Sequence, residues 1–140
     1  MKQAGTAGRI LLGMVIVFIV VSRAATPVTA APFAYVANSG SSTVSVIDLA
    51  NNTPVATVPV SAGPFGVAVH PNGSAVYVTH PYESTASLVS VIATATNTVT
   101  TTITVGLGSM GVTVHPSGTT FYVTNSDNPS VSVIDGTHSE

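Results

Sequence analysis

Residues 66–79 read GVAVHPNGSAVYVT, and the pattern returns at residues 111–124 as GVTVHPSGTTFYVT. The two segments are identical at nine of fourteen positions and are separated by a fixed offset of 45 residues. A partial third copy of the tail, YVAN, lies earlier at residues 35–38. A period of about 40–50 residues is typical of an architecture built from similar, stacked units. The repeat therefore predicts an architecture, although it names neither a ligand nor a substrate.

Each repeat contains about four short segments with the apolar–polar alternation of a β-strand, rich in Val and Thr and separated by turn residues. The expected strands are residues 33–38, 44–48, 53–60, 65–70, 74–80, 87–93, 98–105, 110–115, 119–125 and 130–135. The segment TPVATVPV at residues 53–60 contains two prolines. Each proline removes a ladder donor, which predicts that this strand lies at a sheet edge.

The composition excludes several kinds of partner. All three basic residues, Lys2, Arg9 and Arg23, precede position 31, and the chain from Ala31 onward carries five acids and no base, a formal charge of −5. Nucleic-acid affinity depends mainly on neutralisation of phosphates by Lys and Arg, so we expect no nucleic-acid partner. The chain has no cysteine, which excludes disulfides.

Residues 1–30 have the pattern of an export signal. Lys2 and Arg9 are followed by the apolar run ILLGMVIVFIVV at residues 10–21 and by VTA at residues 28–30, which suits cleavage before Ala31. The run is shorter than the roughly 20 residues of a spanning helix, which favours a cleaved signal helix. Arg23 disfavours translocation, so an uncleaved membrane anchor is the alternative.

Four antiparallel strands per 45 residues are typical of a propeller blade. The sequence thus predicts an all-β fold, with a signal helix at residues 1–30 and a partial β-propeller at residues 31–140. Residues 65–105 supply a full blade, whereas residues 33–60 and 110–135 supply three strands each. The ten strands amount to about two and a half blades.

Several motifs carry a family resemblance, in matching order and spacing. They are YVTH at residues 77–80, YVTN at 122–125, VSVID at 44–48, PFGVAV at 64–69 and the turn HPxG. Together they resemble the YVTN family of β-propeller repeats, which occurs in bacterial and archaeal surface and periplasmic proteins. The resemblance implies strands A (inner) to D (outer), with B–D in residues 33–60, A–D in residues 65–105 and A–C in residues 110–135.

The chain departs from the family pattern at a few positions. His80 replaces the Asn of the signature, Ala93 replaces the Asp that ends VSVID, and His70 and His115 stand where the family more often has Ser.

Propellers close with about 4–8 blades, so two blade faces of this chain would lack neighbours. Three explanations remain open. The chain is a fragment of a longer protein, it completes a ring by self-association with other chains, or it persists as an open wedge. The last is the least favoured, because it would expose a large apolar patch.

His70 and His115 are repeat-equivalent and are the weak candidates for a metal site, because histidine is the commonest metal ligand. Each precedes Pro and a turn, where an imidazole usually caps backbone groups or faces solvent, and no carboxylate stands at ligand spacing. We therefore predict no metal, cofactor or catalytic residue.

Two further patterns have structural explanations. Asp48 and Asp135 are repeat-equivalent carboxylates, and a turn-capping role is the expected one. Gly106, Gly108 and Gly111 match a dinucleotide fingerprint, but a strand is expected after them instead of the helix that this motif requires. We predict a linker between blades there.

These observations predict an exported, non-catalytic binding or scaffold protein of the periplasm, cell surface or extracellular space. Its partner would be a protein or surface component bound by loops at one propeller face, of which residues 81–86 are the most distinctive. The alternative is a fragment of a propeller enzyme, either lactonase-like or a periplasmic oxidoreductase. That alternative requires polar residues at the central channel, for which His70 and His115 are the candidates.

Overall fold

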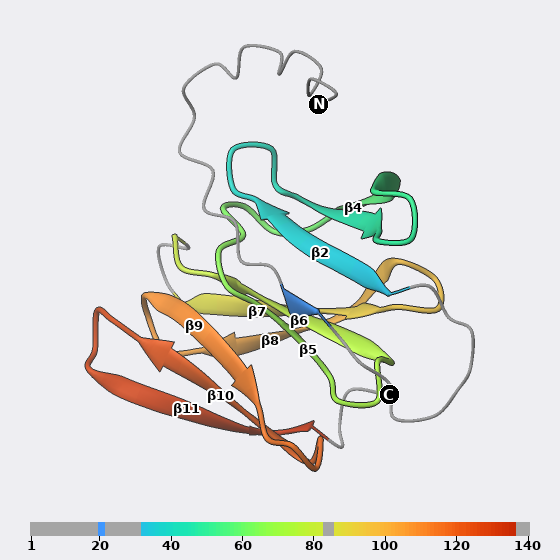
Figure 1. Cartoon of the computed structure of the whole chain (residues 1–140). Coiled ribbons are helices and arrows are strands. Elements are labelled where there is room, and N and C mark those ends of the chain that lie inside the picture. The colour runs from blue at the N-terminus through green and yellow to red at the C-terminus, as the bar shows by residue number, and fades with distance from the viewer. Residues whose placement is uncertain (1–19, 22–31, 83–85, 137–140) are drawn as a thin grey trace, which may run out of the picture.

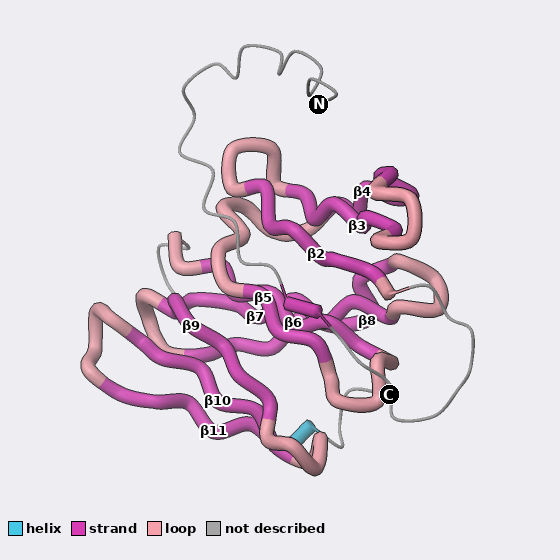
Figure 2. The backbone as a smooth tube through the Cα atoms, viewed as in Figure 1, coloured by secondary structure: helices cyan, strands magenta, loops and turns pink. Residues whose placement is uncertain are grey.

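A computed structural model describes residues 20–21, 32–82 and 86–136. They form eleven strands: β1 (Val20–Val21), β2 (Phe33–Asn38), β3 (Thr43–Asp48), β4 (Thr53–Pro59), β5 (Val67–Val69), β6 (Ala75–His80), β7 (Ser87–Ala93), β8 (Thr98–Val105), β9 (Ser109–Val114), β10 (Thr120–Asn125) and β11 (Ser130–Asp135). Figures 1 and 2 show strands and loops arranged as three sheets, one above the next. The fold is thus all-β, as predicted, and it has the blades of a partial β-propeller.

The three sheets repeat one topology. Their strand orders are β1-β2-β3-β4, β5-β6-β7-β8 and β9-β10-β11, with each neighbouring pair antiparallel. We call these sheets the first, second and third blade. The register also repeats, because Tyr35 pairs with Val46, Tyr77 with Val91 and Tyr122 with Val133. The sequence period is therefore also the structural period.

The strand β1 was not predicted. Val20 and Val21 belong to the apolar run expected to form a signal helix, yet they pair with Tyr35 and Ala34 and take the first-strand position that β5 takes in the second blade. A β-branched apolar pair suits a β-strand as well as it suits an export signal. The other residues of 1–30 lie outside the described part, so the signal peptide and its cleavage site remain predictions. Within the described part, no helix has the length and apolar character needed to cross a membrane.

The sequence placed the proline-containing strand at a sheet edge, and β4 is the last strand of the first blade. The two HPxG turns also form as predicted. In each, the glycine N–H donates to the histidine carbonyl at 2.8 Å, and Gly73 and Gly118 have φ of 78° and 79°, the left-handed region that glycine adopts without strain.

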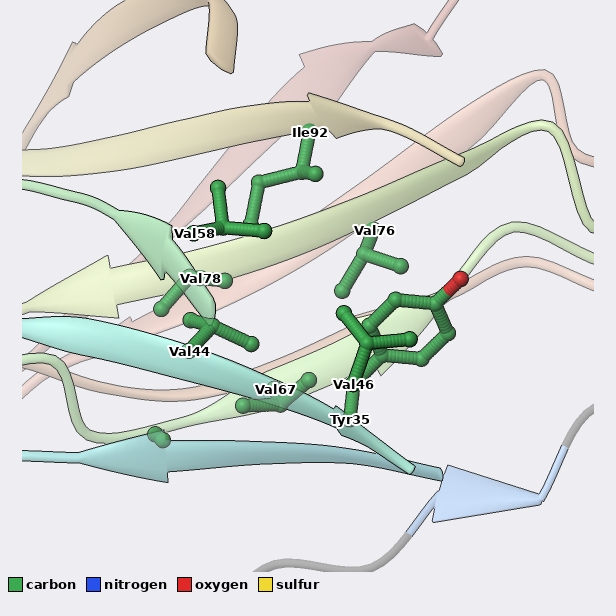
Figure 3. Close-up of a cluster of buried hydrophobic side chains, with 9 residues drawn as sticks. Tyr35, Val44, Val46, Val58, Val67, Val76, Val78 and Ile92 are labelled. Carbon is green, nitrogen blue, oxygen red and sulfur yellow. The ribbon is translucent and has the colours of Figure 1, made fainter. Parts of the chain in front are cut away.

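Each blade has two different faces. We call the face that packs on the following blade the forward face, represented by Val44 and Val46 in the first blade. The face that packs on the preceding blade is the backward face, represented by Val78 and Ile92 in the second. These four side chains share one buried cluster, shown in Figure 3. The core therefore lies between blades.

A second cluster joins the next two blades in the same way. Val89 and Val91 on the forward face of the second blade pack with Phe121 and Val123 on the backward face of the third. Tyr77 stacks on Phe121 with ring centroids 4.4 Å apart. The central blade is covered on both faces, which explains why all six residues of β6 are buried.

Candidate functional site

His70 directly follows β5, the first strand of the second blade, and links two blades. Its Nε2 lies 3.1 Å from the backbone oxygen of Gly118 in the turn of the third blade. Because a carbonyl oxygen can only accept, Nε2 carries the proton and donates. Nδ1 lies 2.5 Å from the side-chain oxygen Oδ1 of Asn72 and 3.3 Å from the backbone nitrogen of Asn72. Both ring nitrogens are thus occupied by structural contacts.

His115 holds the equivalent position one blade later. Its Nδ1 accepts from the backbone N–H of Ser117 at 3.2 Å and contacts the Ser117 hydroxyl at 2.7 Å. Its Nε2 has no hydrogen-bond partner among the residues described, and the ring is exposed. His115 is therefore the histidine of this pair with an open coordination position.

The two metal candidates sit on the turns of different blades. In the part of the chain that is described, no group of three His, Cys, Asp or Glu side chains comes close enough to hold a metal ion. A structural zinc site takes four ligands and a catalytic one three, so His70 and His115 together fall short of either.

His80 is fully buried at the end of β6. Its Nδ1 lies 3.2 Å from the carbonyl oxygen of Ala62 and its Nε2 lies 2.9 Å from the Ser90 hydroxyl. Nδ1 must donate to the carbonyl, so in the neutral ring Nε2 accepts from the hydroxyl. The ring thus ties the second strand to the third and to the linker that enters the blade.

Asparagine does the equivalent work in the other two blades. Asn38 donates through Nδ2 to Thr43 and Ser45, at 3.1 and 2.8 Å. Asn125 donates to Ser130 and Ser132, at 3.1 and 3.0 Å. His80, which replaces the Asn of the signature, therefore joins the same two strands as Asn38 and Asn125 do in their blades.

The loops at one end of the blades form a continuous edge. In an antiparallel blade, the loops between second and third strands lie at the same end as the linkers between blades. We call this edge the loop rim, and its described residues are 39–42, 60–66, 81–82, 86, 106–108 and 126–129. Residues 83–85 of the predicted distinctive loop lie outside the described part.

Two large apolar side chains of the loop rim face solvent. Tyr82 is 67% exposed and Leu107 is 39% exposed. The Tyr82 ring lies over Gly63, where a Cβ atom would stand 2.7 Å from Cδ2 of the ring. The Leu107 linker is bound to the adjacent loop, because Ser126 N–H donates to the oxygen of Gly108 at 2.9 Å. Tyr82 lies in the loop at residues 81–86, which was predicted as the most distinctive one, whereas Leu107 was not predicted as an exposed side chain.

The linker at Gly106 and Gly108 joins β8 to β9, and a strand follows it, as predicted. Asp48 accepts a hydrogen bond from the backbone N–H of Ala50 at 2.8 Å, the turn-capping role that its position suggested.

No family model matches the chain, and no curated protein matches it. Solved β-propeller-like structures do. Hydrazine synthase of Kuenenia stuttgartiensis matches with a TM-score of 0.71 and 26% identity, over 77% of this chain and 30% of that one. A proposed 6-phosphogluconolactonase of Bacteroides fragilis matches with a TM-score of 0.66 and 20% identity, over 74% of this chain and 31% of that one.

Dihydro-heme d1 dehydrogenase NirN matches with a TM-score of 0.66 and 16% identity, over 78% of this chain and 24% of that one. These likenesses support the propeller fold. The chain spans 24–31% of the length of these structures.

Proposed function

We propose that this chain is an exported, non-catalytic propeller module of the YVTN type, which binds a protein or another surface component through the loop rim. The observation that carries the proposal is Tyr82. Its ring is largely exposed and is held against Gly63 on a rim that also presents Leu107. Exposed aromatic anchors of this kind supply much of the binding energy at interfaces.

The state of the histidines supports binding over catalysis. His70 and His80 use both ring nitrogens in contacts that join strands and blades. A general base or metal ligand needs a nitrogen that can reach a substrate or ion. Among the three histidines discussed, this leaves His115.

The proposal is tested by binding of the full chain to an array of cell-envelope components, namely polysaccharides, peptidoglycan fragments and envelope proteins. Tyr82→Ala should weaken binding to the component recognised by tenfold or more, which corresponds to about 1.4 kcal/mol or more. Val55→Ala is the matched control, because Val55 is 52% exposed on β4, away from the loop rim. Equal binding by wild type and Tyr82→Ala would contradict the assignment of the rim.

A second candidate function is that of an enzyme fragment. It is favoured by the descriptions of two structural neighbours, a proposed lactonase and a dehydrogenase. The exposed His115 is the residue through which such a fragment would act. Lactone hydrolysis by the full chain that is lost in His115→Ala, with an unchanged circular dichroism spectrum, would favour this function over the binding module.

A further inference from the structure

The forward face of the third blade is bare where the same residues are covered in the other blades. Val131 and Val133 are 56% and 66% exposed. Their repeat equivalents, Val44 and Val46 in the first blade and Val89 and Val91 in the second, are at most 1% exposed. The side chains and the register are the same. Among the described residues, the third blade differs in having neither a following blade nor a fourth strand beside β11. The two valines lie two residues apart on one face of β11, so they form an apolar patch at the end of the blade stack.

Polar contacts between blades are also left open on the third blade. Between the second and third blades, His70 donates to Gly118 and the Thr79 hydroxyl donates to the oxygen of Met110 at 2.7 Å. The equivalents on the third blade are His115, whose Nε2 has no partner among the described residues, and Thr124. The Thr124 hydroxyl accepts from the N–H of Gly111 at 2.9 Å, and as a donor it reaches the oxygen of the same residue, at 3.5 Å. This face thus presents the donors of a blade contact as well as its valines.

Glycine marks the same contact. At Gly66, a Cβ atom would clash with the backbone oxygen of Met110 in the following blade. At the equivalent Gly111, a Cβ atom would meet only the Thr124 hydroxyl, at 3.2 Å. Gly111 is therefore the glycine that would allow another blade to approach closely, but no blade of the same chain lies against it.

A surface complementary to this face exists on the same chain. On the backward face of the first blade, Val36 and Ile47 are partly exposed, whereas their equivalents Val78 and Ile92 are fully buried beneath the preceding blade. A forward face and a backward face are the two surfaces that already pack together twice within each chain. The first and third blades therefore end the stack with matching halves of one interface.

We propose that two copies of this chain assemble head to tail, with the third blade of each copy packed on the first blade of the other. A contact between two different surfaces closes into a ring when the rotation returns to its start, and otherwise grows into a filament. Three blades from each of two copies make six, inside the range of about 4–8 seen in closed propellers. Three copies would bring nine, outside that range. The occupant of the bare face is thus a second copy.

The mass of the full chain tests the proposal, measured by light scattering on a sizing column over a range of concentrations. The wild type should have the mass of a dimer, and Val133→Glu should have that of a monomer with an unchanged β-type spectrum. Thr102→Glu is the matched control, because it places the same charge on an exposed position of β8, outside both end faces. It should remain dimeric.

Gly111→Ala provides an independent variant in case the charge disturbs folding. In the single chain the added methyl meets only the Thr124 hydroxyl, at 3.2 Å, which must shift slightly. In the dimer it also meets the backbone of the second copy, as a methyl at Gly66 would meet the backbone of Met110. A monomeric wild type at every concentration, a mass that grows without limit, or a dimer that survives both Gly111→Ala and Val133→Glu would each overturn the proposal.

Crosslinking determines which faces meet. The chain has no cysteine, so introduced thiols are the sole reactive ones. Val36→Cys combined with Val133→Cys should yield a crosslinked dimer on mild oxidation. Val133→Cys alone should not. Efficient crosslinking of the single variant would mean that two third blades meet face to face, which would overturn the head-to-tail arrangement.

Discussion

The imidazole of His70 and the backbone oxygen of Gly118, 48 residues apart in sequence, are joined by a hydrogen bond of 3.1 Å between two blades. Removing the ring by His70→Ala leaves that oxygen without its donor. We expect the free energy of unfolding to fall by about 0.5–1.5 kcal/mol. Urea unfolding measured in the Val133→Glu background, which removes assembly, checks this value. His115→Ala in the same background should lower the free energy of unfolding by less, because Nε2 of His115 has no hydrogen-bond partner among the described residues. Equal losses in the two variants would contradict a stabilising role of the His70–Gly118 hydrogen bond.

Tyr77 is fully buried and its hydroxyl has no hydrogen-bond partner among the described residues, while its ring stacks on Phe121. An unsatisfied buried hydroxyl costs about 1–3 kcal/mol. Tyr77→Phe keeps the stacked ring and removes this cost, so we expect the free energy of unfolding to rise by about 1 kcal/mol. Tyr77→Leu, which loses the stack, should lower the stability instead. A destabilised Tyr77→Phe would show that the hydroxyl has a partner.

Gly66 begins the approach of the second blade to the third, and Gly66→Ala should force the two backbones apart. We expect a loss of about 1–3 kcal/mol, typical of overpacking. The matched control is Gly40→Ala, because no atom lies within 4 Å of a Cβ atom built at Gly40. Thermal unfolding of the two variants measures the difference, and similar midpoints would show that the contact at Gly66 relaxes without cost.

Burial raises the pKa of the Tyr35 phenol above its ordinary value. A group whose folded pKa is raised contributes stability that is complete below the unfolded pKa and is lost as pH rises through the folded pKa. Stability should therefore decline above about pH 10. Tyr35→Phe should flatten this decline, as measured by urea midpoints at pH 8 and pH 11. The same decline in wild type and variant would exclude Tyr35 as its source.

The strand β1 pairs Val20 with Tyr35 and Val21 with Ala34, so its removal opens the edge of β2. A chain of residues 31–140 should be less stable than one of residues 20–140 by about 1–2 kcal/mol, the value of one or two hydrogen bonds. Faster hydrogen exchange confined to β2 would identify the cause. Equal stability of the two chains would mean that β1 contributes nothing to the first blade.

The ten strands between residues 33 and 135 could be predicted because the same alternation of strand and turn residues recurs in each repeat. Their observed ends differ from the prediction by two residues at most. The strand β1 was missed for a physical reason. An apolar run behind Lys2 and Arg9 has the properties of an export signal and of a buried strand at once, and only pairing with Tyr35 distinguishes them.

The side chains of the site were less accessible from sequence. The burial of His80 had a faint signal, since Leu88 replaces the hydroxyl residues Thr43 and Ser130 that accept from asparagine in the other blades. The blade count predicted an uncovered face, and the loop at residues 81–86 was predicted as an interaction site. Neither prediction singled out Tyr82 or Val133 as the exposed side chain. The sequence around a tyrosine or a valine does not show whether its side chain is buried or exposed, because exposure depends on which blade or loop packs against it.

The two unlike ends of the blade stack give every chain a polarity, and this has a consequence for mixtures of normal and variant copies. In the proposed dimer, a Val133→Glu copy keeps an intact first blade, so it can pack on the third blade of a normal copy. Its own third blade cannot complete the second contact, so the normal copy is held in a pair that does not close. When the two forms are present in equal amounts and pair at random, about a quarter of the pairs contain two normal copies and can close. Adding the variant should therefore lower the yield of closed assemblies, although the amount of wild type is unchanged.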